Sequence, residues 1–512
     1  MAASAATCIE AGSQAQSQPM NAMTTIDTNT LINSARALPL PATIECTIDG
    51  TVAGLELLET FRVLPKKRMV CLAKWQDKIV VAKLFFSHGR WAQHIQREQQ
   101  GIEALVKADI HTAKLIAKGA STDNACGILL LEYLDQSESL GAQFERSEEG
   151  GIENLLGKVI ALIAQCHALG FLQKDIHLNN FLLRDGKIYL LDAGELEQQS
   201  VGIDSVNSMR NLALFLAQFP VSNDALIPSL YESYRQQRPV VDWSEDIAVF
   251  RALLRKKRLQ RLQIVLKKLY RETSANVCIR DWNRYIVYDR SLDSEELPAF
   301  LSHPDQFIDN GKIIKDGRSA TVAIIEIAGR KYVVKRYNIK SLWHRIRRLF
   351  QPSRAWLCWR NAHMLEMLGI ATAKPLLMME WRFGSLRREA YYLCEYVPGQ
   401  DALHFLKGEP INSPALTLTL AQFKALFRIL RDYCIVHSDM KATNFHISQQ
   451  GITVLDLDAM YQESDQRRFE VARQKDIQRF AKNWEDSPEL AQRVQDMLQS
   501  LEEDSDYFTK GS

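Results

Sequence analysis

The cysteine patterns that organise small or metal-bound folds are missing from this sequence. Its nine cysteines are scattered from position 8 to position 434, with no Cys-x-x-Cys pair and an odd total. This usage disfavours both a zinc site and a disulfide framework, which are built from closely spaced or evenly paired cysteines. We therefore expect a protein of the reducing cytoplasm.

Long apolar runs are missing as well. Nowhere does the sequence contain the roughly 18 consecutive apolar residues that a membrane-spanning helix needs. The first 35 residues contain neither Lys nor Arg, so the chain begins without the basic start and apolar run of a secretory signal. We expect no membrane-spanning helix, and we expect residues 1–50 to form a flexible tail.

The chain also lacks an excess of charge. Lys and Arg number 63 and Asp and Glu number 61, so the net charge of +2 gives no general attraction to nucleic acid or membrane. A content of 46% hydrophobic and 24% charged residues is typical of a folded globular protein. Because one core rarely grows beyond about 250–300 residues, the length of 512 residues predicts two domains.

The sequence contains one order of predicted elements, used twice. Each copy begins with a hairpin pattern that ends at a lysine, Lys83 in the first copy and Lys335 in the second. A helical pattern, a buried strand and an apolar helix follow, and then a polar loop and a short hairpin. We place the two domains at residues 51–295 and 296–512.

The polar loops, "LQKDIHLNNFLL" (172–183) and "VHSDMKATNFHI" (436–447), match in spacing. Each copy has an Asp, an Asn five residues later and an Asp twelve residues after that: Asp175, Asn180 and Asp192, then Asp439, Asn444 and Asp456. A single Asp-x4-Asn is more often a solvated loop, because short motifs have many false positives. The complete set, found twice beside the same predicted elements, favours a shared chemical role.

Phosphoryl transfer from ATP needs residues of these types. One group must orient the acceptor hydroxyl, a cation must contact the phosphates, and oxygen ligands must hold the Mg²⁺ that bridges them. The order and spacing resemble the catalytic loop and the metal-binding aspartate of the protein kinase superfamily. This resemblance implies an α+β fold of two tandem protein-kinase-like domains, each with a small antiparallel sheet and a mainly helical second lobe.

The same resemblance assigns roles to individual residues. Asp175 and Asp439 would orient the acceptor hydroxyl, while Lys83 and Lys335 would bind the ATP phosphates. Glu98, on a helix with Ile95, Ile102, Leu105 and Val106 on another face, would pair with Lys83. The ligands for Mg²⁺ would be Asn180, Asp192, Asn444 and Asp456.

The second copy resembles a more particular family. The segments "SRAWLCWRNAHMLEMLGIATAKPL", "YYLCEYVPG" and "HSDMKATNFHI" are similar to the bacterial lipopolysaccharide kinase family of inner-core heptose kinases, Kdo kinases and ice-nucleation-associated relatives. The similarity covers residues 310–470, and the first copy resembles the N-terminal half of two-domain relatives. It implies phosphorylation of a lipid A-linked core sugar, heptose, at the inner face of the cytoplasmic membrane.

The first copy departs from the kinase pattern at its phosphate loop. No glycine-rich loop is present, because "RVLPKKRMV" (62–70) places basic residues there. Phosphate contact by charge and a solvated turn are both consistent with this segment. The first copy also has Gln173 where the second has His437.

The second copy departs at the helix. Cys358 stands where a Glu would pair with Lys335; this is not a sign of inactivation, and Glu366 and Glu380 are candidates to substitute. Gly317 offers some backbone cover for phosphates. Lys441 would stabilise charge on the transferred phosphoryl group, with an ordinary surface lysine as the alternative. Asp458 is either a neighbour of the metal site or a carboxylate at the end of a strand.

Two segments, 250–272 and 339–354, are rich in Lys and Arg. The segment 339–354 is consistent with a helix on anionic lipid or lipopolysaccharide headgroups, and equally with a packed helix that has a solvated basic face. The more basic segment 250–272 is consistent with attraction to an acidic membrane leaflet. We expect no nucleic-acid binding, because no aromatic platform or reading motif accompanies the charge. Two other functions remain open: an envelope-related scaffold with at most one active copy, and a kinase acting on proteins or small molecules.

Overall fold

The computed structural model describes residues 24–34, 38–86, 89–147, 149–239, 241, 247–338, 351–384 and 386–503. It is 45% helical and 29% strand, and its sheets are antiparallel apart from one short parallel pairing. The predicted mixture of helices and antiparallel strands is confirmed. The chain divides into two compact units, residues 1–218 with 225–257 (unit 1) and residues 219–224 with 258–512 (unit 2).

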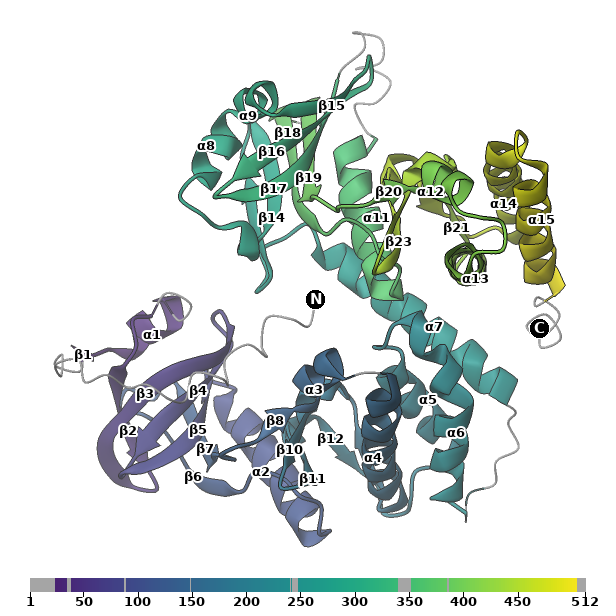
Figure 1. The fold of residues 1–512 in the computed structure, drawn as a ribbon. Helices are drawn as coiled ribbons and strands as arrows, with labels where there is room; N and C mark the ends of the chain where they lie inside the picture. Colours follow the sequence, from purple (N-terminus) through teal and green to yellow (C-terminus); the bar gives the residue numbers. More distant parts are fainter. Residues whose placement is uncertain are drawn as a thin grey trace. The chain divides into compact units, whose positions relative to one another are not determined.

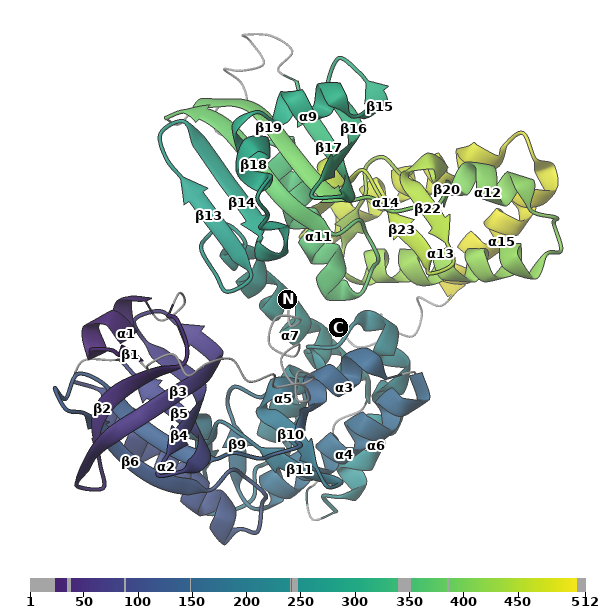
Figure 2. The same cartoon turned by 60° about the vertical axis from the view of Figure 1, so that its left-hand side comes forward.

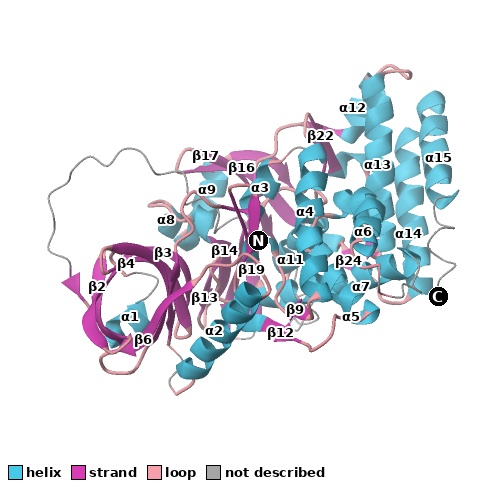
Figure 3. Ribbon diagram, turned by 90° about the horizontal axis from the view of Figure 1, so that it is seen from below, coloured by secondary structure: helices cyan, strands magenta, loops and turns pink. Residues whose placement is uncertain are grey.

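Unit 1 begins with a sheet that closes on itself. Its strands are β1 (Thr24–Thr25), β2 (Ala42–Ile48), β3 (Thr51–Leu64), β4 (Arg68–Trp75), β5 (Lys78–Phe85), β6 (Leu115–Ser121) and β7 (Gly127–Glu132). Their order is β1-β2-β3-β4-β5-β7-β6, and β2 also pairs with β6, which closes the ring seen in Figure 3. The predicted β4–β5 hairpin is confirmed; Gln76 and Asp77 take the left-handed conformation at its turn.

The helices and small strands of unit 1 follow this sheet. Helix α1 (Thr28–Ser34) lies near the start, and α2 (Trp91–Lys107) separates β5 from β6 in the sequence. The remaining helices are α3 (Leu140–Arg146), α4 (Glu149–Ala168), α5 (Ser205–Leu216) and α6 (Ile227–Gln236). Between them are β8 (Glu138–Ser139), β9 (Phe171–Gln173), β10 (Phe181–Arg184), β11 (Lys187–Leu190), β12 (Leu196–Gln198) and the 3-10 helices η1 (Leu178–Asn180) and η2 (Ala193–Glu195).

The chain passes from unit 1 into unit 2 through η3 (Val221–Leu226) and α7 (Ile247–Lys268). Unit 2 then has its own antiparallel sheet, in the order β13-β14-β18-β19-β17-β16-β15. The strands are β13 (Asn276–Arg280), β14 (Arg284–Asp289), β15 (Lys312–Asp316), β16 (Ala320–Ile327), β17 (Arg330–Tyr337), β18 (Pro375–Phe383) and β19 (Leu386–Glu395). The short helices η4 (Arg290–Leu292), α8 (Leu297–Ser302) and α9 (Pro304–Asn310) come between β14 and β15.

Within unit 2, helix α11 (Arg354–Leu368) lies between the sheet and the helical part (Figures 1 and 2). Ser353 caps its first turn and Gly369 ends it in the left-handed conformation. The helical part contains α12 (Ala402–Gly408), α13 (Pro414–Asp432), α14 (Gln466–Ala481), α15 (Pro488–Glu503) and η7 (Lys482–Trp484). Its small strands are β20 (Gln400–Asp401), β21 (Ile435–Val436), β22 (Phe445–Ser448), β23 (Gly451–Val454) and β24 (Tyr461–Gln462), with η5 (Ala442–Asn444) and η6 (Leu457–Ala459).

Two expectations about the ends of the domains differ from the structure. The flexible tail expected over residues 1–50 is wrong for β2, because Ile44, Cys46 and Ile48 are buried in the first sheet. Residues 1–23 lie outside the described ranges. The boundary between the two units falls at Lys257/Arg258 and not at 295/296. Strands β13 and β14, which come before residue 295, pair with the second sheet and so belong to unit 2.

None of the helices in the described ranges is both long and apolar enough to cross a membrane.

Candidate active sites

In unit 1 the predicted lysine and two predicted carboxylates meet. Lys83 on β5 donates hydrogen bonds to Glu98 on α2 and to Asp192, the latter over 3.3 Å. The side chains of all three are mostly buried. Burial opposes the charge of Lys83, but the two carboxylates outweigh it and raise its pKa above the ordinary value. The lysine is therefore held charged between two elements.

The helix places Glu98 on its buried face, which corrects the sequence analysis. Glu98 is 4% exposed, like Ile95 and Ile102 on either side of it in the helical repeat. The spacing of three and four residues puts these side chains in one row. The carboxylate was assigned to another face because charge predicts exposure, whereas here the lysine offsets the cost of burial.

The two polar loops, 172–183 and 436–447, have the same backbone geometry at their Asn and at the Asp that follows. Asn180 and Asn444 each donate from Nδ2 to the carbonyl oxygen five residues earlier, over 2.7 Å. Asp192 and Asp456 both adopt the left-handed conformation, with φ of 59° and 56°. Because each Asn amide nitrogen is already bonded, its Oδ1 atom is left to accept or to bind a cation.

In unit 2 the lysine contacts one predicted carboxylate. Lys335 Nζ lies 2.9 Å from Asp456 Oδ1, and the pair is partly buried. Burial opposes the ionised form of Asp456, but Lys335 outweighs it and lowers the pKa of that carboxyl. The two candidates to substitute for a helix Glu have other partners, since Glu366 contacts His363 and Glu380 contacts Arg382.

The predicted acceptor-orienting carboxylates differ in their surroundings. Asp175 has a 63% exposed side chain, and His177 Nε2 lies 3.8 Å from it. Asp439 is 26% exposed and lies between two cations, with Lys441 Nζ at 3.3 Å and Arg479 Nη2 at 2.5 Å. Lys441 thus lies beside the loop carboxylate, and its role in stabilising charge on the transferred phosphoryl group stays a prediction.

Gly317 lies in the turn between β15 and β16, and its amide donates to Ala320 O over 3.1 Å. The turn is closed further by Asn338, whose Nδ2 donates to Gly317 O over 3.2 Å. Lys315, on β15 before this turn, acts electrostatically on Asp456. The β15–β16 hairpin is therefore close to the Lys335–Asp456 pair.

Two further charged residues at these sites, Arg479 and Lys315, were not singled out by sequence reasoning, whereas Arg68 belongs to the basic segment 62–70 noted there. Arg479 comes from α14, 40 residues after the loop that it contacts, and no local motif marks it. Lys315 precedes Gly317 by two residues. Arg68 Nη1 lies 3.8 Å from Asp192, and its Nε is buried without a hydrogen-bond partner. The basic segment 62–70 therefore faces the site through Arg68.

The side chains that hydrogen-bond to the backbone of each loop differ between the two units. In unit 2, Asp476 accepts hydrogen bonds from the amides of His437 and Ser438, and His437 Nε2 contacts Leu455 O at 3.2 Å. Burial lowers the pKa of His437 and raises that of Asp476. In unit 1, Gln173 takes the place of this histidine and donates to Leu191 O over 3.0 Å.

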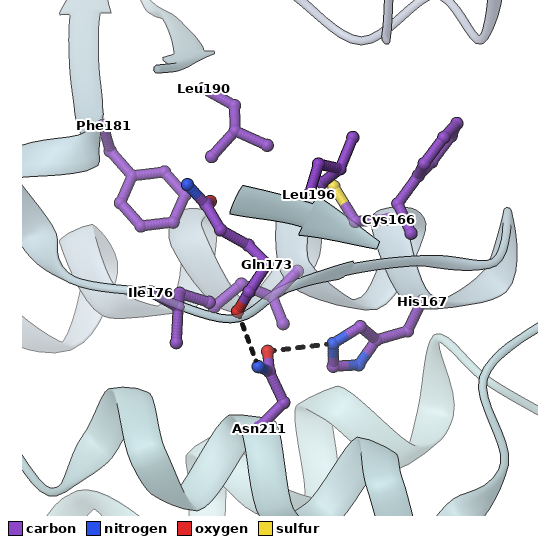
Figure 4. Close-up of a pocket in the computed structure, with 10 residues that line it drawn as sticks. Cys166, His167, Gln173, Ile176, Phe181, Leu190, Leu196 and Asn211 are labelled. Carbon is purple, nitrogen blue, oxygen red and sulfur yellow. Dashed lines mark hydrogen bonds between the residues drawn. The ribbon is translucent and has the colours of Figure 1, made fainter. Parts of the chain in front are cut away.

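The corresponding support in unit 1 is a chain of neutral polar groups beside a cavity of about 10 Å³ (Figure 4). Asn211 donates to Gln173 O over 2.9 Å and contacts His167 Nε2 through its Oδ1 at 3.1 Å. His167 Nδ1 lies 2.6 Å from Tyr234 Oη. A neutral imidazole satisfies both contacts by donating to Asn211 and accepting from Tyr234.

This arrangement predicts a pH dependence of stability. Burial lowers the pKa of His167 to about 4. An unfolded histidine has a pKa of about 6.5, so between these values the unfolded chain binds a proton that the folded chain does not. Stability is therefore expected to fall by about 2 kcal/mol from His167 alone between pH 7 and pH 5. Urea unfolding of the wild type and of His167→Gln at both pH values measures this, and equal pH dependence in the two chains would contradict it.

The residues present fit a magnesium ion bound together with phosphates. Mg²⁺ is held in proteins by one or two carboxylates plus water and substrate phosphates. Each unit offers one Asp carboxylate and one Asn Oδ1 brought close by a backbone hydrogen bond, Leu191 N to Asn180 O and Leu455 N to Asn444 O. No cluster of three His, Cys, Asp or Glu residues fit for a metal occurs in the described part of the chain. One carboxylate and one amide oxygen leave most of the Mg²⁺ coordination to water and phosphate, so this donor set suits a cation shared with a ligand.

A comparison with known families finds a match within unit 1. The lipopolysaccharide kinase (Kdo/WaaP) family has a model that matches residues 68–212, a segment that includes Lys83, Glu98, Asp175 and Asp192. The family resemblance seen in the sequence is thus confirmed, and the match lies in the first copy. The similarity over residues 310–470 stays a prediction. No curated protein matches the chain.

Proposed function

We propose that the chain is an ATP- and Mg²⁺-dependent phosphotransferase that phosphorylates a sugar hydroxyl, on heptose, of the lipopolysaccharide inner core. The observation that carries this proposal is the repeated cluster of a buried lysine, an Asp in the left-handed conformation and an oriented Asn. In this proposal the two units are tandem protein-kinase-like domains. The acceptor class comes from the family match over residues 68–212.

The residues of each unit divide the work in this proposal. Lys83 and Lys335 bind the phosphates of ATP, with Arg68 and the turn at Gly317 beside them. The oxygens of Asn180, Asp192, Asn444 and Asp456 hold Mg²⁺, which when bound neutralises charge on the phosphates. Asp175 and Asp439 accept a hydrogen bond from the acceptor hydroxyl and so aim its oxygen at the terminal phosphorus.

Unit 2 is the more complete catalytic unit in this proposal. Arg479 and Lys441 both contact Asp439, so the aspartate is held in place and positive charge lies beside the transferred phosphoryl group. In unit 1 Asp175 is exposed, and the ion-pair contact found for it in the described residues is with His177, at 3.8 Å. We therefore assign turnover mainly to unit 2.

The core oligosaccharide tests the acceptor. Cells that lack the gene are expected to make inner core that is lighter by the mass of one phosphate group per modified sugar, and the gene restores it. Mass spectrometry of the released oligosaccharide measures this. An unchanged mass distribution would exclude the lipopolysaccharide core as the acceptor. Whether the protein uses ATP would then be decided by measuring ATP turnover.

The exposure of Asp175 favours the alternative that unit 1 is a scaffold. A unit whose Asp175 orients no acceptor would act as a scaffold, and at most one copy would then be active. A protein or small-molecule acceptor is the remaining alternative. Transfer of labelled phosphate from ATP to a peptide mixture or to free sugars, with none to the lipopolysaccharide core, would favour it.

We also propose a cytoplasmic protein with peripheral contact to the inner face of the cytoplasmic membrane through residues 250–272. Arg258 in this segment is not available, because it is buried in an ion pair with Asp224 at 2.8 Å. Lys256, Lys267 and Lys268 on α7 are exposed. The second basic segment, 339–354, lies outside the described residues except for 351–354.

Charge reversal on α7 tests this contact. Changing Lys256, Lys267 and Lys268 to Glu is expected to reduce binding to vesicles that contain phosphatidylglycerol, because each basic residue at an anionic surface contributes about 1 kcal/mol. Co-sedimentation at low salt measures the bound fraction. A matched triple reversal at the exposed Lys107, Lys114 and Lys187 is the control. An equal loss in both variants would indicate a nonspecific charge effect and contradict the assignment to α7.

A further inference from the structure

The turn after the hairpin β10–β11 in unit 1 and the turn after the hairpin β22–β23 in unit 2 differ at one position that lies close to the lysine. Unit 1 has Asp192, Ala193 and Gly194, whereas unit 2 has Asp456, Leu457 and Asp458. In both units the first Asp is left-handed and the next residues form a 3-10 helix, η2 or η6, packed on a long helix. Gly194 and Asp458 therefore occupy equivalent places.

The packing of these turns aligns the two long helices. A Cβ atom at Gly101 on α2 would lie 2.2 Å from Ala193 O, so this glycine touches the turn directly. On α11 the equivalent contact is made by Asn361, whose Nδ2 donates to Leu457 O over 2.9 Å. Three residues earlier in each helix stand Glu98 and Cys358, which are thus equivalent positions.

The carboxylate and the small residue have exchanged places between the units. In unit 1 the helix provides Glu98 and the turn provides Gly194, where a Cβ atom would lie 2.7 Å from Glu98 Oε2. In unit 2 the helix provides the small, buried Cys358 and the turn provides Asp458. Each unit thus has one carboxylate beyond the first Asp, and in unit 1 a Cβ atom at position 194 would require the end of the Glu98 side chain to move.

The surroundings of Asp458 agree with this exchange. Its side chain is 12% exposed, and Arg354 Nε lies 3.4 Å from its Oδ2. It is close enough to act electrostatically on both Lys335 and Cys358. Since Arg354 is the first residue of α11, the helix reaches the site through this arginine, whereas α2 reaches it through Glu98 itself.

We propose that Asp458 is the positioning residue that replaces Glu98 in unit 2 and that, together with Asp456, it holds the ammonium group of Lys335 in place for the phosphates of ATP. The nucleotide part of this proposal rests on the function proposed for Lys335. The exchange of the carboxylate between helix and turn stands on the packing alone. The two parts can be tested separately.

A double-mutant cycle tests the exchange without nucleotide. Cys358→Glu in the full chain is expected to lower the midpoint of thermal unfolding, because it adds a buried carboxylate beside Asp456 and Asp458. Adding Asp458→Gly recreates the unit 1 pattern and is expected to recover most of that loss. Losses that simply add in the double variant would overturn the exchange.

Binding of ATP with Mg²⁺, measured by isothermal titration calorimetry in a Lys83→Met background, tests the positioning role. Asp458→Asn keeps the shape of the side chain, so we expect an unchanged unfolding midpoint and affinity about 10-fold or more weaker, as for other residues that orient a binding group. Asp458→Gly alone is expected to lose affinity, and Asp458→Gly with Cys358→Glu to recover it.

The outcomes separate the two proposals. Unchanged affinity in Asp458→Asn, or no recovery in the double variant, would overturn the role of Asp458. If the Lys83→Met parent itself does not bind ATP with Mg²⁺, the proposed function of unit 2 fails, and the unfolding cycle still decides whether the carboxylate has exchanged places.

Discussion

Replacing Asp439 with Asn is expected to lower the rate of phosphate transfer from ATP to the lipopolysaccharide core by about 10²–10⁴-fold, the usual contribution of a positioned acid–base group. The carboxylate lies at the start of the loop, with Arg479 at 2.5 Å and Lys441 at 3.3 Å. Asparagine has almost the same shape but is a weaker acceptor for a hydroxyl proton. Transfer of labelled phosphate to purified core oligosaccharide measures the rate, and an unchanged unfolding midpoint shows that the fold is kept.

Asp175→Asn is the matched control, because Asp175 holds the same place in unit 1. We expect a smaller effect, since its side chain is 63% exposed and no cation comparable to Arg479 contacts it among the described residues. Equal losses in the two variants would mean that both units transfer phosphate. Unchanged rates in both would remove catalysis by these loops altogether.

The second large effect is expected from Gly101→Ala in unit 1. The added Cβ atom would lie 2.2 Å from Ala193 O and 2.9 Å from Ala193 Cβ, so α2 and the turn after Asp192 must separate. Overpacking of this kind costs about 1–3 kcal/mol. The separation also moves Glu98 away from Lys83, and binding of ATP to unit 1 is expected to weaken. Urea unfolding and calorimetry measure the two effects.

Gly157→Ala is the control for this substitution. Gly157 lies within α4, and a Cβ atom there meets nothing within 4 Å. Alanine in a helix is favoured over glycine by about 0.5–1 kcal/mol, so this variant is expected to be slightly more stable than the wild type. If the two glycine variants change stability in the same direction, the close contact of α2 with the turn is not what constrains position 101.

The repeated spacing of Asp, Asn and Asp was sufficient to predict that the two loops are alike. Asn180 and Asn444 make the same hydrogen bond, because both intervals in the sequence set where the loop ends and the hairpin begins. The hairpin before Lys83 was predictable for a similar reason, since its alternation of buried and exposed residues is local.

Contacts between distant segments were not predictable in this way. Glu98 was placed on the wrong face of its helix. Its burial depends on an ion pair with Lys83 of β5, which the helix sequence alone does not show. Arg479 was missed because α14 reaches Asp439 only through the packing of the helical part. The 295/296 boundary was set by the start of the second repeat, whereas β13 and β14 had already joined the second sheet.

The sequence by itself therefore determined the order of the elements, the duplicated lysine, asparagine and aspartates, and the resemblance to a kinase family, because all of these are properties of neighbouring residues. Only the tertiary structure decided which charges meet. In unit 1 the second carboxylate beside the lysine is Glu98 from the helix, and it faces Gly194 of the turn. We propose that in unit 2 the turn provides it instead, as Asp458. That choice is made by packing between segments that are about 90 to 100 residues apart in the chain.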